Sequence, residues 1–373
     1  MLKMNIIRNL LYLSILVIVD AKKIFIDNDG LTGLQALFPL YGGHEIVGIS
    51  MSFGSASTVD STGMGYEVLK EYNLSSCIPL YVGANQPLIR TNETFHIWEQ
   101  LFGELVWQGA FSASYEDSFT WDNITYNDTL PGAVALINAV KQYKDSDPVV
   151  IFAAGMMTTV AQAISLYPNL AQESGGLYVM GGYFDNQYSE STGNAINFDI
   201  NTDINLMQDP EAAQIVLTAE WPELIIGGNV TNYLVPSQQL YDKLIARGGG
   251  LDKINSDPYL ASVQNIVFTG NYSKNNDQQT LPFWDEVVSS FMAFPDMIKS
   301  SIDVNCAVDT SYYSPFYGNL RIWGQDFAPK NVKTGNATII TSIDDDRFYA
   351  MMIDILYTDW RQYCYNKSYK VYE

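Results

Sequence analysis

The sequence predicts an α/β fold with an open, mostly parallel central sheet and helices on both faces. Short, continuous apolar runs rich in β-branched residues alternate with longer segments whose apolar residues recur at helical spacing. Continuous apolar runs are typical of strands buried on both faces, and alternation of strand and helix is typical of parallel sheets. The expected strands span residues 23–27, 45–50, 78–83, 148–155 and 176–182, and the expected helices span 57–73, 131–143 and 158–172.

Composition and charge restrict the classes of partner. The 373 residues are 47% hydrophobic and 16% charged, which is enough for a large core. A formal net charge of −21 argues against binding to nucleic acid or to anionic membranes, and it suits cations and neutral small molecules. No Pro/Gly linker marks a boundary, so residues 22–373 are expected to form a single domain. The aromatic stretch 91–130 departs from the strand–helix rhythm and is predicted to be an insertion or lid.

The first 21 residues have the pattern of a signal peptide. Lys3 and Arg8 precede the apolar run LLYLSILVIV, and the segment ends at Ala21 as a cleavage site. Because a membrane span needs about 20 apolar residues, no stable membrane anchor is expected, with an uncleaved anchor as the alternative. The expected location is secreted or extracellular, or elsewhere on the secretory pathway, with the vacuole and the cell wall as candidates.

The sequons and the cysteines agree with passage through the secretory pathway. Asn-x-Ser/Thr tripeptides are acceptors for N-linked glycans, which lie on surface loops of secreted proteins. Eight are present, at Asn73, Asn92, Asn123, Asn127, Asn229, Asn271, Asn336 and Asn366. Three cysteines, Cys77, Cys306 and Cys364, are too few for a disulfide scaffold and lack metal-type spacing. We expect one bridge, between Cys306 and Cys364, and one buried, inert thiol.

Two aspartates follow the first expected strand and are the first candidate for a site. In open α/β sheets ligands gather at the carboxyl ends of the strands, which is where Asp27 and Asp29 fall. A hard cation such as calcium needs several oxygen ligands, and carboxylates on one short loop supply them. A loop that only caps the next helix is the other interpretation, because Asp and Asn are common in such loops.

Two further segments carry candidate polar residues. In TDINLMQDPEAAQIVL, residues 202–217, Asp203 and Asn205 alternate with apolar residues, so one extended segment can aim both side chains at a single ligand; surface decoration is the alternative. Asp209 and Pro210 in the same segment are typical of a helix start. Asp285 also lies at a helix start, where the helix dipole favours an acid in any protein. With only two histidines, a His-rich metal site and a Ser-His-Asp triad are not expected.

Taken in order, these segments resemble the inosine–uridine preferring nucleoside hydrolase family. The resemblance runs from about residue 23 to residue 355 and is closest to the secreted, glycosylated branch found in fungi. It implies a nucleoside hydrolase-like, Rossmann-like fold. The segments that carry it are the first strand with its D-x-D loop, VGISMSFGSAS, IPLYVGANQPL, VVIFAAGMMTTVAQAISLYPNLA, GLYVMGGYF, TDINLMQDPEAAQIVL and FWDEV.

The resemblance implies a purine or pyrimidine nucleosidase that hydrolyses the N-glycosidic bond of ribonucleosides to ribose and free base. It assigns Asp29 as the base that takes a proton from a metal-bound water and as a calcium ligand, with Asp27 as a neighbouring ligand or sugar contact. A main-chain oxygen near Thr158 and the carboxylate of Asp285 complete the calcium site. Asp203 and Asn205 are implied to bind ribose hydroxyls.

The chain departs from the family pattern at several of these positions. The family's first loop continues D-x-D-P-G-x-D-D, whereas here Gly33 and Leu34 stand where the two last acids belong. Ser55 replaces an Asn beside the sugar, and Trp284 replaces a His that precedes the late Asp, so Trp284 is expected to stack on the base. The second hypothesis is therefore a weak or inactive secreted relative that binds a nucleoside, a sugar or a protein partner. Base preference and oligomeric state are left open, a homo-oligomer included.

Overall fold

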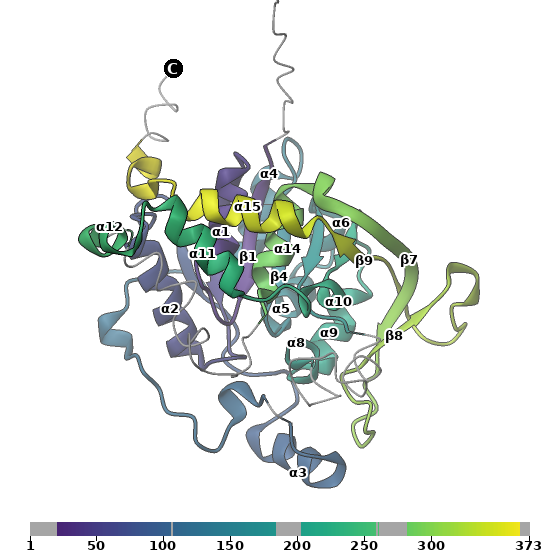
Figure 1. Cartoon of the computed structure of the whole chain (residues 1–373). Helices are drawn as coiled ribbons and strands as arrows, with labels where there is room; N and C mark the ends of the chain where they lie inside the picture. Colours follow the sequence, from purple (N-terminus) through teal and green to yellow (C-terminus); the bar gives the residue numbers. More distant parts are fainter. Residues whose placement is uncertain (1–20, 106, 184–202, 259, 261–281, 366–373) are drawn as a thin grey trace, which may run out of the picture.

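The computed structural model describes residues 21–105, 107–183, 203–258, 260 and 282–365. The first 20 of the 21 residues of the expected signal peptide lie outside this range, as do the sequons at Asn271 and Asn366. The predicted fold class is confirmed: the described strands form one 9-stranded, mostly parallel sheet in the order β3-β2-β1-β4-β5-β6-β9-β7-β8, with helices on both sides (Figure 1). The strands are β1 (Lys23–Asn28), β2 (Glu45–Met51), β3 (Leu80–Val82), β4 (Val150–Ala154), β5 (Gly176–Val179), β6 (Leu224–Ile226), β7 (Ile298–Val308), β8 (Leu320–Trp323) and β9 (Gly335–Ile343).

Neighbouring strands from β3 to β9 in this order run parallel, and only β7 pairs antiparallel, with β9 and with β8. The five strands expected from apolar runs are β1 to β5, and each lies within one residue of, or inside, its expected range. Their position at the buried centre explains why they read as continuous apolar runs. The sequence patterns did not predict β6 to β9.

The described helices cover both faces of the sheet and enclose two apolar clusters. One cluster joins α1, α14 and α15 to one face, and the other joins α4, α5 and α9 to the opposite face. The helices are α1 (Leu34–Tyr41), α2 (Thr58–Glu71), α3 (Asn92–Phe102), α4 (Gly132–Tyr143), α5 (Thr158–Leu166), α6 (Leu170–Glu173), α8 (Ile204–Met207), α9 (Pro210–Leu217), α10 (Gly228–Thr231), α11 (Gln238–Arg247), α12 (Leu251–Ser256), α14 (Trp284–Ala293) and α15 (Asp345–Leu356). No described helix is long and apolar enough for a membrane span.

The segment that contains Asp203 and Asp209 confirms one prediction and corrects another. Asp209 is the N-cap of α9 and accepts a hydrogen bond from the N–H of Ala212, with Pro210 in the first turn, as predicted. The expected extended segment around Asp203 is wrong, because residues 204–207 form the short helix α8. The carbonyl of Asp203 accepts hydrogen bonds from the N–H groups of Leu206 and Met207, which closes that helical turn.

The sequons differ in their exposure. Asn73, Asn92, Asn123 and Asn336 are exposed and Asn127 is half-buried, which suits glycan acceptors. Asn229 is only 9% exposed, within α10, so the folded chain does not present it to solvent.

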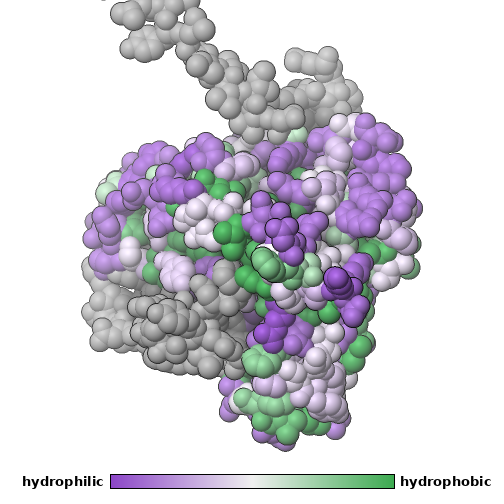
Figure 2. Space-filling model, turned by 90° about the vertical axis from the view of Figure 1, so that its right-hand side faces the viewer, coloured by the Kyte–Doolittle hydropathy of each residue, from purple (hydrophilic) through white to green (hydrophobic). Residues whose placement is uncertain are grey.

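The stretch 91–130 forms α3 and irregular loops, and Figure 1 shows α3 at the foot of the molecule, remote from α15. At the foot of the molecule, the surface in Figure 2 carries hydrophobic patches among polar ones. Ile97 and Leu101 of α3 are 41% and 58% exposed. The inner face of α3 packs Phe95 and Trp98 in a third apolar cluster, which also contains Met207 and Tyr317.

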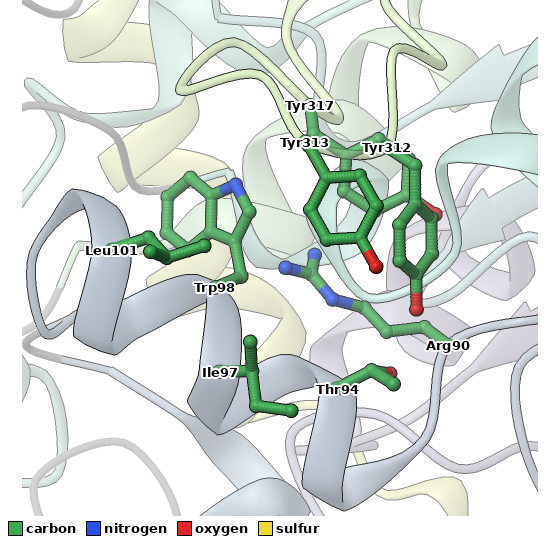
Figure 3. A pocket seen from close by; sticks show the side chains of 8 residues that line it. All are labelled: Arg90, Thr94, Ile97, Trp98, Leu101, Tyr312, Tyr313 and Tyr317. Carbon is green, nitrogen blue, oxygen red and sulfur yellow. The ribbon is translucent and has the colours of Figure 1, made fainter.

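A buried arginine joins this stretch to the body of the protein. Arg90 is 2% exposed, and its guanidinium lies 4.9 Å from the ring centres of Phe95 and Tyr317 and 5.4 Å from that of Trp98. Its Nη1 donates to the carbonyl of Met207. Burial lowers the pKa of this guanidinium to about 10. A cavity of about 30 Å³ beside it is lined by α3 and by the tyrosines of the 312–317 loop (Figure 3).

The expected Cys306–Cys364 bridge is wrong. Cys77 and Cys364 form the disulfide, with their Cα atoms 5.5 Å apart, and Cys306 is a buried free thiol. Cys306 lies in β7 between its partners Ile322 of β8 and Gly335 of β9. A cysteine held within the sheet cannot reach the segment that follows α15, where Cys364 lies.

Removal of the disulfide should destabilise the protein. The bridge closes a loop of 287 residues, so Cys77→Ser should lower the free energy of unfolding by about 2–5 kcal/mol in urea titrations. Mapping of non-reduced peptides should link Cys77 to Cys364. Cys306→Ala is the control, which should lose only the packing of one small side chain and keep the link. A linked peptide that contains Cys306 would contradict the assignment.

Replacement of the buried arginine should loosen the 91–130 stretch. Arg90→Ala removes the hydrogen bond to Met207 and the contacts with three aromatic rings, so we expect a loss of about 2–4 kcal/mol in the free energy of unfolding. Limited proteolysis should then cut within residues 91–130 first. The control is Arg347→Ala, which removes an exposed ion pair with Asp296 and should cost less than about 1 kcal/mol. Equal losses in the two variants would refute the role of Arg90.

Candidate functional site

The candidate site lies at the carboxyl end of β1, the strand flanked by β2 and β4. Asp27 is buried there, and the hydroxyl of Ser50, its register partner on β2, donates to Asp27 Oδ1 at 2.5 Å. Burial raises the pKa of Asp27 to about 7, against the effect of that hydrogen bond. The negative charge of Asp29 adds to the shift. The strand end therefore holds two acids that are costly to ionise together.

Asp29 is enclosed by two glycines from neighbouring strand ends. A Cβ atom on Gly54 would lie 1.9 Å from Asp29 Oδ2, and one on Gly155 would lie 3.0 Å from Asp29 Cβ. The backbone N–H of Ser55 donates to Asp29 Oδ2 at 2.7 Å. Burial raises the pKa of Asp29 to about 7, and the N–H of Ser55 opposes this shift. Only glycine at positions 54 and 155 leaves room for the carboxylate in this place.

Asp285 reaches the same place from the first turn of α14. The amide nitrogen Nδ2 of Asn28 donates to Asp285 Oδ2 at 3.0 Å, although the two residues are 257 positions apart in the sequence. Gln35 Nε2 donates to the same oxygen at 3.4 Å. Burial raises the pKa of Asp285 well above its usual range, and the charges of Glu286 and Asp29 raise it further. The structure thus places Asp285 at the end of β1, close enough to Asp29 for the two charges to interact.

Asp203 and Asn205 lie at the exit of β5, two strands from β1 in the sheet. Asp203 Oδ2 accepts the N–H groups of Gly182 at 2.7 Å and Tyr183 at 3.1 Å, and Asn205 Nδ2 donates to the carbonyl of Met180 at 3.0 Å. Burial raises the pKa of Asp203 to about 6, and the two N–H groups oppose the shift. Both side chains therefore fix the Met-Gly-Gly turn at the same edge of the sheet.

The side chains of Thr158 and Trp284 form hydrogen bonds with residues other than the acids at the end of β1. Thr158 is the first residue of α5, and its hydroxyl donates to Asp209 Oδ2 at 2.5 Å. The contact between the end of β4 and Asp29 runs through Gly155. Trp284 is half-buried at the start of α14 and donates from Nε1 to Asn232 Oδ1 at 2.9 Å, which fixes the orientation of its indole ring next to Asp285.

The 91–130 stretch reaches the edge of this site. The carbonyl of Gly54, next to Ser55, accepts the N–H of Ala110 at 3.0 Å and Nε2 of Gln208 at 2.9 Å. A Cβ on Gly109 would lie 2.4 Å from the same carbonyl, and Gly109 has a φ of 57°, so a larger residue would not fit. The 91–130 stretch therefore helps to hold the loop that follows β2, and its role as a lid stays a prediction.

Sequence reasoning missed several polar residues of the site. Asn28 and Gln35 are buried and bind Asp285, and the Thr32 hydroxyl donates to Glu286, the residue after Asp285. The signal that was available is the position of these polar residues within otherwise apolar segments, β1 and α1. Within the described part of the chain, no group of three Asp, Glu, His or Cys side chains is arranged to hold a metal ion.

Comparison with known proteins agrees with this geometry. The family model described as inosine-uridine preferring nucleoside hydrolase matches residues 24–350. An uncharacterized protein of Schizosaccharomyces pombe is 43% identical, with 93% of this chain and 88% of that protein covered. The pyrimidine-specific ribonucleoside hydrolase RihB of Escherichia coli is 24% identical, with 83% of this chain and 87% of that protein covered.

Solved structures show the same fold. The plant nucleoside hydrolase PpNRh1 is similar with a TM-score of 0.66 at 18% identity, over 90% of this chain and 98% of that one. The purine-preferring ribonucleoside hydrolase of Gardnerella vaginalis has a TM-score of 0.63 at 17% identity, with the same shares covered. The match of the family model over most of the chain, on a fold that joins Asp29 and Asp285 at one edge of the sheet, shows that this chain belongs to the inosine-uridine preferring nucleoside hydrolase family.

Proposed function

We propose that the protein hydrolyses the N-glycosidic bond of a ribonucleoside, or of a related N-riboside, to ribose and free base, with Asp29 as the base. The observation that carries the proposal is the junction at the end of β1, where Asn28 joins Asp285 across 257 residues of sequence and Asp29 lies alongside. Family membership supports ribonucleoside hydrolysis in general. We further propose that the chain is secreted and carries glycans on its exposed sequons.

A metal ion is the cofactor that family membership implies, and calcium held by Asp29, Thr158 and Asp285 is the finer form of that expectation. The residues present do not fit it. Gly33 and Leu34 supply no carboxylate, and Asp285 Oδ2 is occupied by two amide donors.

Asp29 suits the role of a base. Its carboxylate is held by the N–H of Ser55 and by close packing against Gly54 and Gly155, so it is fixed before a substrate binds. A pKa near 7 makes a carboxylate a stronger proton acceptor than a solvent-exposed one and leaves it partly ionised at neutral pH. In the proposed reaction it takes a proton from the water that attacks the anomeric carbon of the ribose.

The other acids suit a sugar that becomes positively charged. Cleavage of an N-glycosidic bond proceeds through an oxocarbenium-like ribose, and preorganised negative groups stabilise such a charge. Asp27 and Asp285 lie next to Asp29 at the strand end. Asp203 and Asn205 are proposed to bind ribose hydroxyls, and Trp284 to stack on the base. The indole of Trp284 cannot protonate the leaving base as an imidazolium would, which favours bases that leave as stabilised anions or take their proton from water.

A ligand-binding protein without turnover is the second candidate function. The observation that favours it is the pair of amide donors on Asp285, because they neutralise part of the negative field that a cationic sugar would need. Such a protein would bind a nucleoside or a sugar at the same edge of the sheet and release no base.

Release of base tests the two candidates directly. Purified protein incubated with inosine, guanosine, uridine or cytidine should release base from at least one of them, measured by chromatography. Asp29→Asn should lower kcat by about 10²–10⁴, because the amide cannot accept the proton. The exposed surface substitution Asp326→Asn is the control and should keep full activity. Nucleoside binding without base release would favour the second function, and full activity of Asp29→Asn would refute the role of Asp29.

Asp203 should make the protein less stable as the pH rises. Its folded pKa of about 6 lies above the usual aspartate value of 3.8, so its protonated form adds stability that is fully present below pH ~4 and is lost as the pH rises through ~6. The difference corresponds to on the order of 3 kcal/mol in the free energy of unfolding between pH ~4 and pH ~7. Asp203→Asn removes this titration, so its stability should fall less over the same range in urea titrations. Parallel curves for wild type and variant would contradict the prediction.

A further inference from the structure

The loop after β1 leaves no place for the two acids that the family pattern has at positions 33 and 34. Gly33 has a φ of 102°, and a Cβ atom there would lie 2.9 Å from Cε2 of Tyr72. Leu34 begins α1 and is 2% exposed, within the apolar cluster between the sheet and α14. An acid at 33 would be strained and would clash, and one at 34 would be buried among apolar side chains. The loop is therefore rebuilt around other polar groups.

Asn28 is oriented by the backbone of the same loop. The N–H of Gly30 donates to Asn28 Oδ1 at 2.6 Å, and Asn28 Nδ2 donates to Asp285 Oδ2 at 3.0 Å. A flipped amide would place its NH2 group against the N–H of Gly30 and its oxygen against a carboxylate oxygen, and both contacts are repulsive. The amide oxygen thus faces away from Asp285, and the amide hydrogens face it.

Gln35 is oriented in the same way from α1. Its Oε1 accepts a hydrogen bond from the backbone N–H of Thr32 at 2.9 Å. Its Nε2 is directed to Asp285 Oδ2 at 3.4 Å and to the carbonyl of Gly30 at 3.5 Å. The hydroxyl of Ser289 on α14 donates to the Gln35 carbonyl at 2.7 Å, which holds the first turn of α1 against the helix that carries Asp285.

The chemistry of these donors is opposite to that of a calcium site. Calcium takes 6–8 oxygen ligands at about 2.3–2.6 Å, whereas here the groups nearest to Asp285 Oδ2 present N–H hydrogens. Amide hydrogens carry partial positive charge and repel a cation, and they satisfy a carboxylate by charge-assisted hydrogen bonds. We propose that in this protein the amide groups of Asn28 and Gln35 hold Asp285 in place of a divalent cation, so that the site binds its ligand without calcium.

The inference concerns the site of the proposed function, and its tests do not depend on turnover. The full chain, purified and passed through a chelating resin, should contain far less than one calcium per molecule by elemental analysis. Its Tm in EGTA and in excess calcium chloride should agree to about 1 °C. A site that is saturated at 100 times its Kd would instead raise the Tm by about 3–4 °C. Stoichiometric calcium, or a Tm shift of that size, would overturn the proposal.

Two isosteric substitutions test the amides themselves. Asn28→Asp and Gln35→Glu keep the oxygen that accepts the loop N–H groups but turn a carboxylate oxygen toward Asp285. Like charges at about 3 Å repel, so the Tm of both variants in EGTA should fall by several degrees. Gln325→Glu, which adds the same charge at an exposed position, is the matched control and should leave the Tm nearly unchanged. Tm values for the two variants that equal the control value would overturn the proposal.

The two proposals can fail separately. If the protein releases base, the rate should be equal within a factor of about two in EGTA and in calcium chloride, because no step needs the cation. If it releases none, elemental analysis and the Tm measurements still decide whether the amides have replaced the cation.

Discussion

The burial of several carboxylates at one edge of the sheet is the constraint on which the rest of the site depends. Asp27 and Asp29 are buried where they leave β1, two residues apart, and the half-buried Asp285 enters from α14, so three acids meet at this edge. Each acid must find donors, since an unpaired buried charge costs several kcal/mol. Ser50, Ser55 and Asn28 supply one donor to each acid, which ties β2 and α14 to the end of β1.

Close backbone approach makes this arrangement possible. Gly54 and Gly155 lie in the loops that follow β2 and β4, and any side chain at either position would overlap Asp29. The 91–130 stretch also approaches closely, because Gly109 lies against the carbonyl of Gly54 and its neighbour Ala110 donates to that carbonyl. Backbone from the loops after β2 and β4 thus encloses the Asp29 carboxylate, and the 91–130 stretch holds the first of these loops. A group held so tightly loses little entropy on binding a substrate, which suits a catalytic base better than a flexible surface acid.

The central strands and the acids at their ends could be predicted from the sequence because local pattern determines both. A strand buried on two faces must be apolar throughout, and parallel strands present their carboxyl ends at one edge. The antiparallel part was missed for a physical reason: β7 is exposed over its first half and β9 alternates between buried and exposed residues, so neither is a continuous apolar run. The disulfide was missed because the pairing depends on where α15 delivers Cys364, which no local pattern records.

The amide groups could not be predicted, because their role depends on direction and not on residue type. Asn and Gln carry an acceptor and a donor on the same group, and the sequence does not say which one faces the site. The backbone sets the direction: the N–H groups of Gly30 and Thr32 donate to the amide oxygens, so the amide NH2 groups face Asp285. Polar residues that could have been calcium ligands thereby become substitutes for calcium.

This exchange has a consequence for ligand recognition. A divalent cation attracts sugar hydroxyls through their oxygens, whereas buried carboxylates attract them through their hydrogens, as acceptors. If Asp27, Asp29 and Asp285 face the sugar without a cation between them, they present acceptors and a net negative field. That field repels nucleoside phosphates and favours neutral nucleosides, and it stabilises positive charge on the ribose ring more directly than a site whose carboxylates are already neutralised. With amides in place of a metal, the negative field of the carboxylates thus acts directly on the positive charge that develops on the sugar.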